Sequence, residues 1–216
     1  MFLTAWLGAV LPLVAGSPKA APVPVHPDPV LLVHGFADSE RNMRWLAHYL
    51  RHEGWEVHTV RLTPNLAQKG LEPLAGQIDA YAREQFGARR FSLVGFSMGG
   101  LVSRYYMQRM GGIERVEHFV TLAAPHNGSM LANLLPIQGC REMRPGSAFL
   151  RDLESDVDRL EGVKFTSVYT PFDLTIVPPR SSVMPQARNV AIPVVMHPLM
   201  IIDRRSLRAV AEALRS

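Results

Sequence analysis

Residues 91–107 form a short apolar run that passes through Gly95-Phe96-Ser97-Met98-Gly99 directly into a second, helix-periodic apolar run. A serine hydroxyl is a useful nucleophile only when a tight turn presents it next to a base. Glycine has no Cβ, so the strand and helix can approach closely while Ser97 takes a strained backbone conformation. The alternative is a glycine-rich turn that holds an ordinary serine. The runs on both sides favour a strand–turn–helix elbow with Ser97 as the nucleophile.

Strand-like and helix-like runs alternate along most of the chain. A strand, helix, strand, helix rhythm predicts a mostly parallel sheet of about six strands with helices on both faces, with the strand before Ser97 near its centre. The expected strands are residues 30–33, 57–60, 91–96, 116–122, 165–169 and 190–195. The expected helices are residues 42–53, 71–86, the run after Ser97, 148–153 and 206–214.

Two further motifs flank the elbow in the chain. Val33-His34-Gly35-Phe36 ends an upstream strand, and residues 121–129, Thr-Leu-Ala-Ala-Pro-His-Asn-Gly-Ser, end a downstream one. With the Gly-x-Ser-x-Gly elbow between them, these motifs resemble those of α/β-hydrolases of the bacterial lipase and esterase type. The resemblance runs from about residue 29 to the C-terminus. It implies a minimal α/β-hydrolase fold without a large cap domain and, counting strands from Val30, the spatial order 2-1-3-4-5-6.

The same resemblance implies an oxyanion hole made of two backbone N–H groups. One belongs to Phe36, in the loop after the first strand, and the other to Met98, directly after the nucleophile. Ligands of open α/β sheets bind at such strand ends. We expect His34 and His126 to brace their loops, because the histidine of a triad on this fold follows the acid in the chain.

The acid is expected in a loop after a strand that follows the nucleophile. Asp173 lies in the turn after residues 165–169, although Pro-x-Asp is also a common composition of ordinary turns. The other aspartates considered lie in or beside predicted helices or follow the last histidine: Asp152, Asp156, Asp158 and Asp203. We therefore predict that Asp173 is the acid of a triad.

His197 is the only histidine after Asp173. A lone histidine among apolar residues is often structural, but this one follows a predicted strand and completes the order Ser, Asp, His. Two positions further on, where some larger bacterial lipases carry a calcium-binding aspartate, this chain has Leu199. We predict that His197 is the catalytic base and that the protein has no metal and no cofactor.

Residues 130–137 are short, apolar and interrupted by a proline. They form either a buried helix that closes the core or an exposed apolar rim over the acyl site, where exposed apolar area typically binds lipid or a partner. Loops at strand ends build the substrate contacts of this architecture, which favours the rim. Met130, Leu134 and Leu135 are therefore candidate substrate-binding residues over a shallow pocket.

The 216 residues, 47% of them hydrophobic, suffice for one well-buried domain. The net charge of +4 comes from scattered arginines without a nucleic-acid-binding motif, so we expect no nucleic-acid partner. Transient contact with a membrane or lipid surface is compatible with this basic balance. The single cysteine, Cys140, excludes an internal disulfide. The oligomeric state stays open, and a monomer is favoured.

Residues 1–24 are expected to be an apolar segment followed by a Pro- and Ala-rich linker, with the catalytic domain at 25–216. The apolar run is shorter than a bilayer span and resembles a signal-peptide core, but it lacks a basic start. An export signal, a short membrane anchor and a mis-assigned start are the three alternatives. We favour export, hence a secreted or periplasmic protein, over a membrane-associated or cytoplasmic one.

The expected function is hydrolysis of carboxylic esters, those of lipids in particular, through an acyl-enzyme on Ser97. An acyltransferase or a thioesterase with the same triad is the alternative within enzymes. A non-catalytic protein that binds lipid or a partner on a hydrolase scaffold is the alternative from another class, since a fold does not fix a function.

Overall fold

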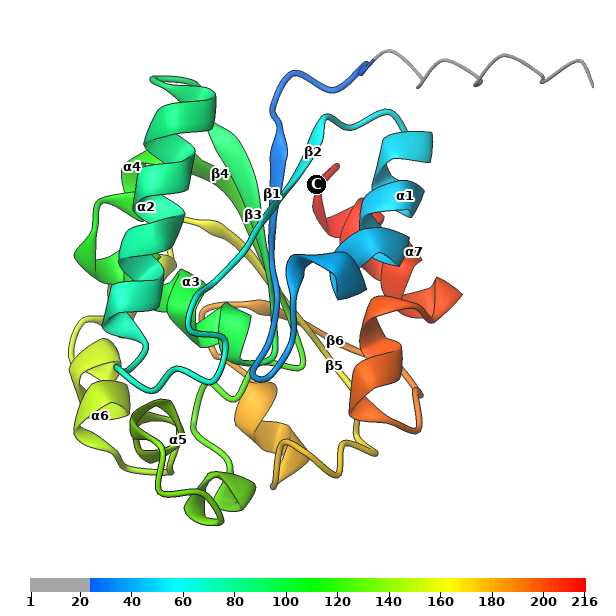
Figure 1. Cartoon of the computed structure of the whole chain (residues 1–216). Coiled ribbons are helices and arrows are strands. Elements are labelled where there is room, and N and C mark those ends of the chain that lie inside the picture. The colour runs from blue at the N-terminus through cyan, green and yellow to red at the C-terminus, as the bar shows by residue number, and fades with distance from the viewer. Residues whose placement is uncertain (1–23) are drawn as a thin grey trace, which may run out of the picture.

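The computed structural model describes residues 24–216, which form one six-stranded parallel sheet between two layers of helices (Figure 1). The strand order is β2-β1-β3-β4-β5-β6, as predicted, and β3 ends at the predicted nucleophile elbow near the middle of the sheet. The strands are β1 (Val30–Val33), β2 (Val57–Val60), β3 (Phe91–Phe96), β4 (Val116–Leu122), β5 (Lys164–Tyr169) and β6 (Arg188–Ala191).

The central strands β1 and β3 are buried at every position because helices cover both faces of the sheet. In β1, Leu31 and Val33 enter one core cluster, whereas Val30 and Leu32 enter the other. Side chains alternate across a strand, so a strand buried on both sides must be apolar at every position. This explains why the central strands appear in the sequence as continuous apolar runs rather than as alternating ones.

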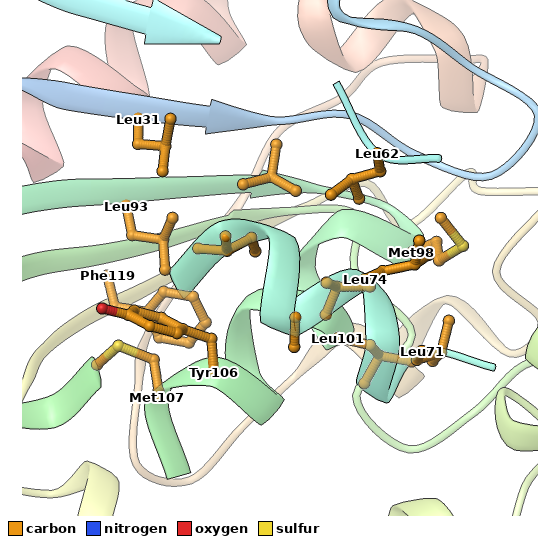
Figure 2. Packing of buried hydrophobic residues seen from close by; sticks show 14 of the residues in the cluster. Leu31, Leu62, Leu71, Leu74, Leu93, Met98, Leu101, Tyr106, Met107 and Phe119 are labelled. Atoms are coloured by element: carbon orange, nitrogen blue, oxygen red, sulfur yellow. The ribbon is translucent and has the colours of Figure 1, made fainter. Parts of the chain in front are cut away.

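Two pairs of helices cover the sheet, α2 (Glu72–Phe86) and α3 (Met98–Arg109) on one face and α1 (Arg44–His52) and α7 (Arg204–Ala213) on the other (Figure 1). Figure 2 shows the first layer, in which Leu101 and Tyr106 of α3 belong to one buried cluster with Leu93 and Phe119 of the sheet. Helix α3 is buried on nearly all sides. It therefore holds the elbow rigidly against the sheet.

The segment between β4 and β5 contains only short elements and no cap domain. They are α5 (Gln138–Glu142), α6 (Ala148–Glu154) and the 3₁₀ turns η2 (Met130–Asn133) and η3 (Val157–Leu160). Further short elements are α4 (Gly112–Arg115), η1 (Glu40–Met43), η4 (Pro179–Ser182) and η5 (His197–Ile201). The mouth of the site is therefore formed by loops and short turns.

The last strand differs from the prediction. It spans Arg188–Ala191 instead of residues 190–195. The Ile192 N–H still donates to the Tyr169 carbonyl at 2.8 Å, but Pro193 then has no N–H to offer and the pairing stops. The shorter strand leaves residues 193–196 as a connection that leads to His197.

The predicted signal segment and cleavage site fall in residues 1–23, outside the described part, so the domain boundary and export stay predictions. Within residues 24–216, no helix combines the length and the apolar character needed to cross a bilayer.

Candidate active site

Ser97 lies at the sharp turn between β3 and α3. Its backbone has φ 53° and ψ −125°, a positive-φ conformation that a residue with a Cβ adopts only under strain. The Ser97 N–H donates to the Leu122 carbonyl of β4 at 2.8 Å, which ties the turn to the neighbouring strand. Strain held in this way by surrounding structure is typical of functional sites.

The glycines of the elbow are required by close backbone packing. A Cβ at Gly95 would lie 2.7 Å from the Gly100 Cα, and one at Gly99 would lie 2.6 Å from the Val33 carbonyl oxygen. A Cβ at Gly35 would sit 3.0 Å from the Ser97 Cβ. Contacts below 3.0 Å with backbone atoms cannot be relieved by turning a side chain. The Gly-x-Ser-x-Gly pattern therefore reflects how tightly β3, α3 and the end of β1 meet.

This packing predicts a large loss of stability for Gly99→Ala. The new methyl group would push α3 away from the end of β1, and overpacking of this kind costs roughly 1–3 kcal/mol or more. Gly76→Ala is the matched control, since Gly76 lies in α2 and an added Cβ there would meet no described atom within 4 Å beyond the nearby backbone of its own helix. It should be neutral or stabilise by up to about 1 kcal/mol. Thermal unfolding of both variants tests this, and equal melting temperatures would contradict it.

Asp173 and His197 are hydrogen-bonded, with 2.8 Å between Asp173 Oδ2 and His197 Nδ1. The other carboxylate oxygen, Oδ1, accepts the N–H groups of Thr175 and Ile176 at 2.8 Å each. Both side chains are buried, and the His197 ring packs on Phe96 with 4.9 Å between ring centroids. An ionised carboxylate only accepts hydrogen bonds, so His197 carries its proton on Nδ1 and leaves Nε2 with a free lone pair.

Ser97 and His197 line the same pocket, which has a volume of about 430 Å³. The structure thus gathers the three predicted residues from the ends of β3 and β5 and from the start of η5. Within residues 24–216, the Ser97 hydroxyl has no hydrogen bond to His197 or to any other group. In unliganded sites such contacts are often long and tighten when substrate binds.

Phe36 and Met98 are the two residues whose backbone N–H groups are predicted to form the oxyanion hole. Phe36 lines the pocket with Ser97, and Met98 is the first residue of α3, where helix N–H groups lack intrahelical acceptors. Neither N–H donates a hydrogen bond within the described part of the chain. Both N–H groups are thus unpaired there, as the predicted oxyanion hole requires, and this role stays a prediction.

His34 and His126 both hold loops. The Leu62 N–H donates to His34 Nε2 at 3.0 Å, so His34 Nδ1 carries the proton and donates to the Gly35 carbonyl at 2.9 Å. His126 lies 3.0 Å from Thr121 Oγ1 through Nε2. Its burial lowers the pKa of His126 well below the usual value, so it stays neutral at physiological pH.

A second, smaller cavity of about 130 Å³ also reaches Ser97. Of the candidate substrate-binding residues, Leu135 lines it, whereas Met130 and Leu134 lie outside its lining and are 56% and 74% exposed. Sequence reasoning missed Cys140 and Met143, which line the same cavity from α5 and the residue after it. Both lie more than 40 residues after Ser97 in the chain, and no sequence motif indicates that they approach it.

Within the described residues, no three metal-ligating side chains lie close enough together to hold an ion. The expected absence of a metal and of a cofactor stays a prediction.

The comparison with protein families identifies the chain. Residues 29–172, about two thirds of its length, match the family model described as palmitoyl protein thioesterase. The chain belongs to this family. The palmitoyl protein thioesterase match includes Phe36, Ser97 and Met98 and ends one residue before Asp173. The roles of Asp173 and His197 therefore rest on geometry and chain order rather than on the family match.

Individual relatives of this palmitoyl protein thioesterase family member include a lipase and a thioesterase. A triacylglycerol lipase of Burkholderia plantarii is 29% identical over 61% of the chain and 41% of its own length. The human lysosomal thioesterase PPT2 is 29% identical over 57% of the chain and 43% of its own length. The chain thus spans about two fifths of these relatives.

A solved structure shows the same fold. The mature Bacillus licheniformis lipase BlEst2 superposes with a TM-score of 0.74 over 92% of this chain and 96% of that one, at 19% identity. Over residues 24–216, the palmitoyl protein thioesterase family member described here has the α/β-hydrolase fold, with six parallel strands and without a large cap domain.

Proposed function

We propose that this protein hydrolyses carboxylic esters of acyl chains, those of lipids in particular, through an acyl-enzyme on Ser97. The observation that carries the proposal is the Asp173–His197 hydrogen bond of 2.8 Å in the wall of the pocket that Ser97 also lines. The strained elbow and the two free N–H groups supply the remaining parts of an acyl-transfer site. The lipase and thioesterase relatives support the same class of reaction.

In the first half of the reaction, Ser97 Oγ attacks the substrate carbonyl and its proton passes to His197 Nε2. The carbonyl oxygen becomes an oxyanion, which accepts the N–H groups of Phe36 and Met98. When the intermediate collapses, the bond to the leaving oxygen breaks and His197 returns its proton to that oxygen. Ser97 then carries the acyl group as an ester.

In the second half, a water molecule attacks the acyl-enzyme and gives its proton to His197. Collapse releases the carboxylic acid and restores the Ser97 hydroxyl. Asp173 fixes the His197 tautomer and stabilises the imidazolium that forms twice in each cycle. The N–H groups of Thr175 and Ile176 keep the carboxylate in place.

Thioester hydrolysis is a second candidate, supported by the family match and by the thioesterase relatives. The attack and the acyl-enzyme are the same, but a thiolate departs more readily than an alkoxide and needs less proton donation from His197. Matched ester and thioester substrates with one acyl group should therefore share one deacylation rate and differ only in acylation.

The test is to trap the covalent intermediate. We expect a chromogenic ester to give a burst of about one product per enzyme molecule when acylation outpaces deacylation, and rapid quenching to give an intact mass increased by the acyl group. A fluorophosphonate should label the protein once, and peptide mapping should place the label on Ser97. The proposal would be contradicted if the ester turned over steadily while no acyl adduct formed at any quench time and no phosphonate labelled the protein.

A further inference from the structure

Ser97 lies where two cavities of different size and character meet. Both are lined by Phe36, Ser97 and Thr175. The larger one, about 430 Å³, includes His197, and we call it the histidine-side cavity. The smaller one, about 130 Å³, is lined mainly by residues of the segment between β4 and β5 and does not include His197 among its lining residues; we call it the small cavity.

The direction of proton transfer decides which part of a substrate enters which cavity. His197 must protonate the leaving atom, so the leaving group has to depart on the side of Ser97 where the imidazole lies. The acyl chain extends from the same carbonyl carbon in another direction. We propose that the small cavity holds the acyl chain and the histidine-side cavity holds the leaving group. This assignment rests on the proposed acyl-transfer function.

The walls of the small cavity suit an acyl chain and limit its length. They are mainly apolar, with Ala132, Leu135, Cys140 and Met143 among them. Burial raises the pKa of the Cys140 thiol, so this wall stays uncharged. A volume of about 130 Å³ is slightly smaller than a cavity of roughly 150 Å³ that binds benzene, a ligand of six carbons. The cavity therefore buries only the first few carbons, and a longer chain must emerge between the half-exposed Leu131 and Leu135.

The histidine-side cavity is more than three times larger and mixed in chemistry. Asp38, Asn42 and Arg44 contribute polar and charged groups, and Trp45 and Ile202 contribute exposed apolar surface. A cavity of this kind accepts a bulky leaving group with polar and apolar parts. The substrate class that fits both cavities is a short-chain acyl ester or thioester of a large alcohol or thiol, in contrast to a substrate whose acyl part is as long as palmitoyl.

The first experiment varies the acyl chain on one chromogenic alcohol, from acetyl to palmitoyl. In the wild type, kcat/KM should rise about fourfold per added methylene until the small cavity is full, at about four to five carbons, and then level off. Ala132→Leu should abolish the rise, and Met143→Ala should move the plateau to longer chains. The two variants change cavity size in opposite directions, so a general loss of folding cannot imitate both results.

The matched variant on the other side is Trp45→Ala. It should leave the plateau of the acyl series at the same chain length. In a series of butyrate esters, it should lower the ratio of kcat/KM for a bulky aryl ester to kcat/KM for the ethyl ester at least fourfold. Deacylation rates from single turnovers separate the cavities further, because the leaving group has already departed. They should change in Ala132→Leu and Met143→Ala and stay constant in Trp45→Ala.

A reversed pattern would overturn the assignment: Trp45→Ala shifting the acyl plateau, or Ala132→Leu changing the alcohol series alone. An unbroken rise in kcat/KM from acetyl to palmitoyl in the wild type would overturn the short-chain specificity. Failure of the proposed function looks different, since the wild type would then form no acyl adduct on Ser97 with any ester or thioester in either series.

Discussion

Ser97→Ala and His197→Ala are each expected to lower ester kcat/KM by roughly 10⁴–10⁶-fold, because each removes a member of one catalytic unit. Asp173→Asn should cost roughly 10⁴-fold. Its carbonyl oxygen can still accept from Thr175 and Ile176, but the amide NH₂ then faces His197 Nδ1 and imposes the other tautomer. Nε2 would then carry a proton and could no longer accept one from Ser97.

The measurement is kcat/KM with a single purified preparation of each variant, normalised by its folded fraction. All three should retain nearly the wild-type melting temperature, because the side chains lie at strand ends and in loops. The double variant Ser97→Ala/His197→Ala should be little worse than either single one, since one loss already disables the unit. Activity near wild type in Asp173→Asn would show that the acid lies elsewhere.

The positions of the strands and the elbow could be predicted because each depends on local patterns, whereas the strand order was implied by the resemblance to bacterial lipases and esterases. The central strands are continuous apolar runs, and parallel strands joined by helices permit few arrangements. The elbow was recognisable because close backbone contacts leave no room for a Cβ at Gly95 and Gly99, the two glycines around Ser97. The residues at strand ends then had to converge at one edge of the sheet.

The rest depended on contacts between distant segments. The small cavity is built by α5 and η2 folding back toward Ser97, and no short motif records that approach. The end of β6 was predicted too far along the chain, because apolar residues continue to Val195. The missing N–H of Pro193 decides where strand pairing stops. Of the three predicted rim residues, Leu135 lines the small cavity and Met130 and Leu134 lie outside its lining, and their role in substrate binding stays a prediction.

Arg104 is the buried residue that the sequence prediction overlooked, although a sign was present. Arg104 and Gln108 follow Leu101 at helical spacing, on the face of α3 that should be buried. The Arg104 side chain has no exposed surface and donates to Gln108 Oε1 at 2.9 Å, to the Leu153 carbonyl at 2.9 Å and to the His126 carbonyl at 3.3 Å. Arg104 thus joins the nucleophile helix to α6 and to the loop after β4.

Arg104→Ala is expected to lower the free energy of unfolding by about 3–5 kcal/mol. The buried His126 carbonyl and Gln108 Oε1 would lose their donor, at about 1–3 kcal/mol each, and the lost side chain would leave a cavity. The Leu153 carbonyl would still accept from the Gln108 amide at 2.8 Å. The ion pair with Glu154 adds little, because the Glu154 side chain is 60% exposed. For a domain of this size, the melting temperature should fall by roughly 6–20 °C. Arg104→Lys should restore only part of this, since one ammonium cannot replace the planar fork of donors.

Arg109→Ala is the matched control on the same helix. Arg109 also makes several hydrogen bonds, to Asp152 and Asp156 among others, but its side chain is 22% exposed and water can reach the groups that it leaves behind. Its loss should cost no more than about 1 kcal/mol. Arg104 holds α3 and the loop at His126 in position. At a temperature at which both variants are folded, kcat should therefore fall further in Arg104→Ala than in Arg109→Ala. Equal shifts in melting temperature for the two variants would show that burial of Arg104 does not stabilise this junction.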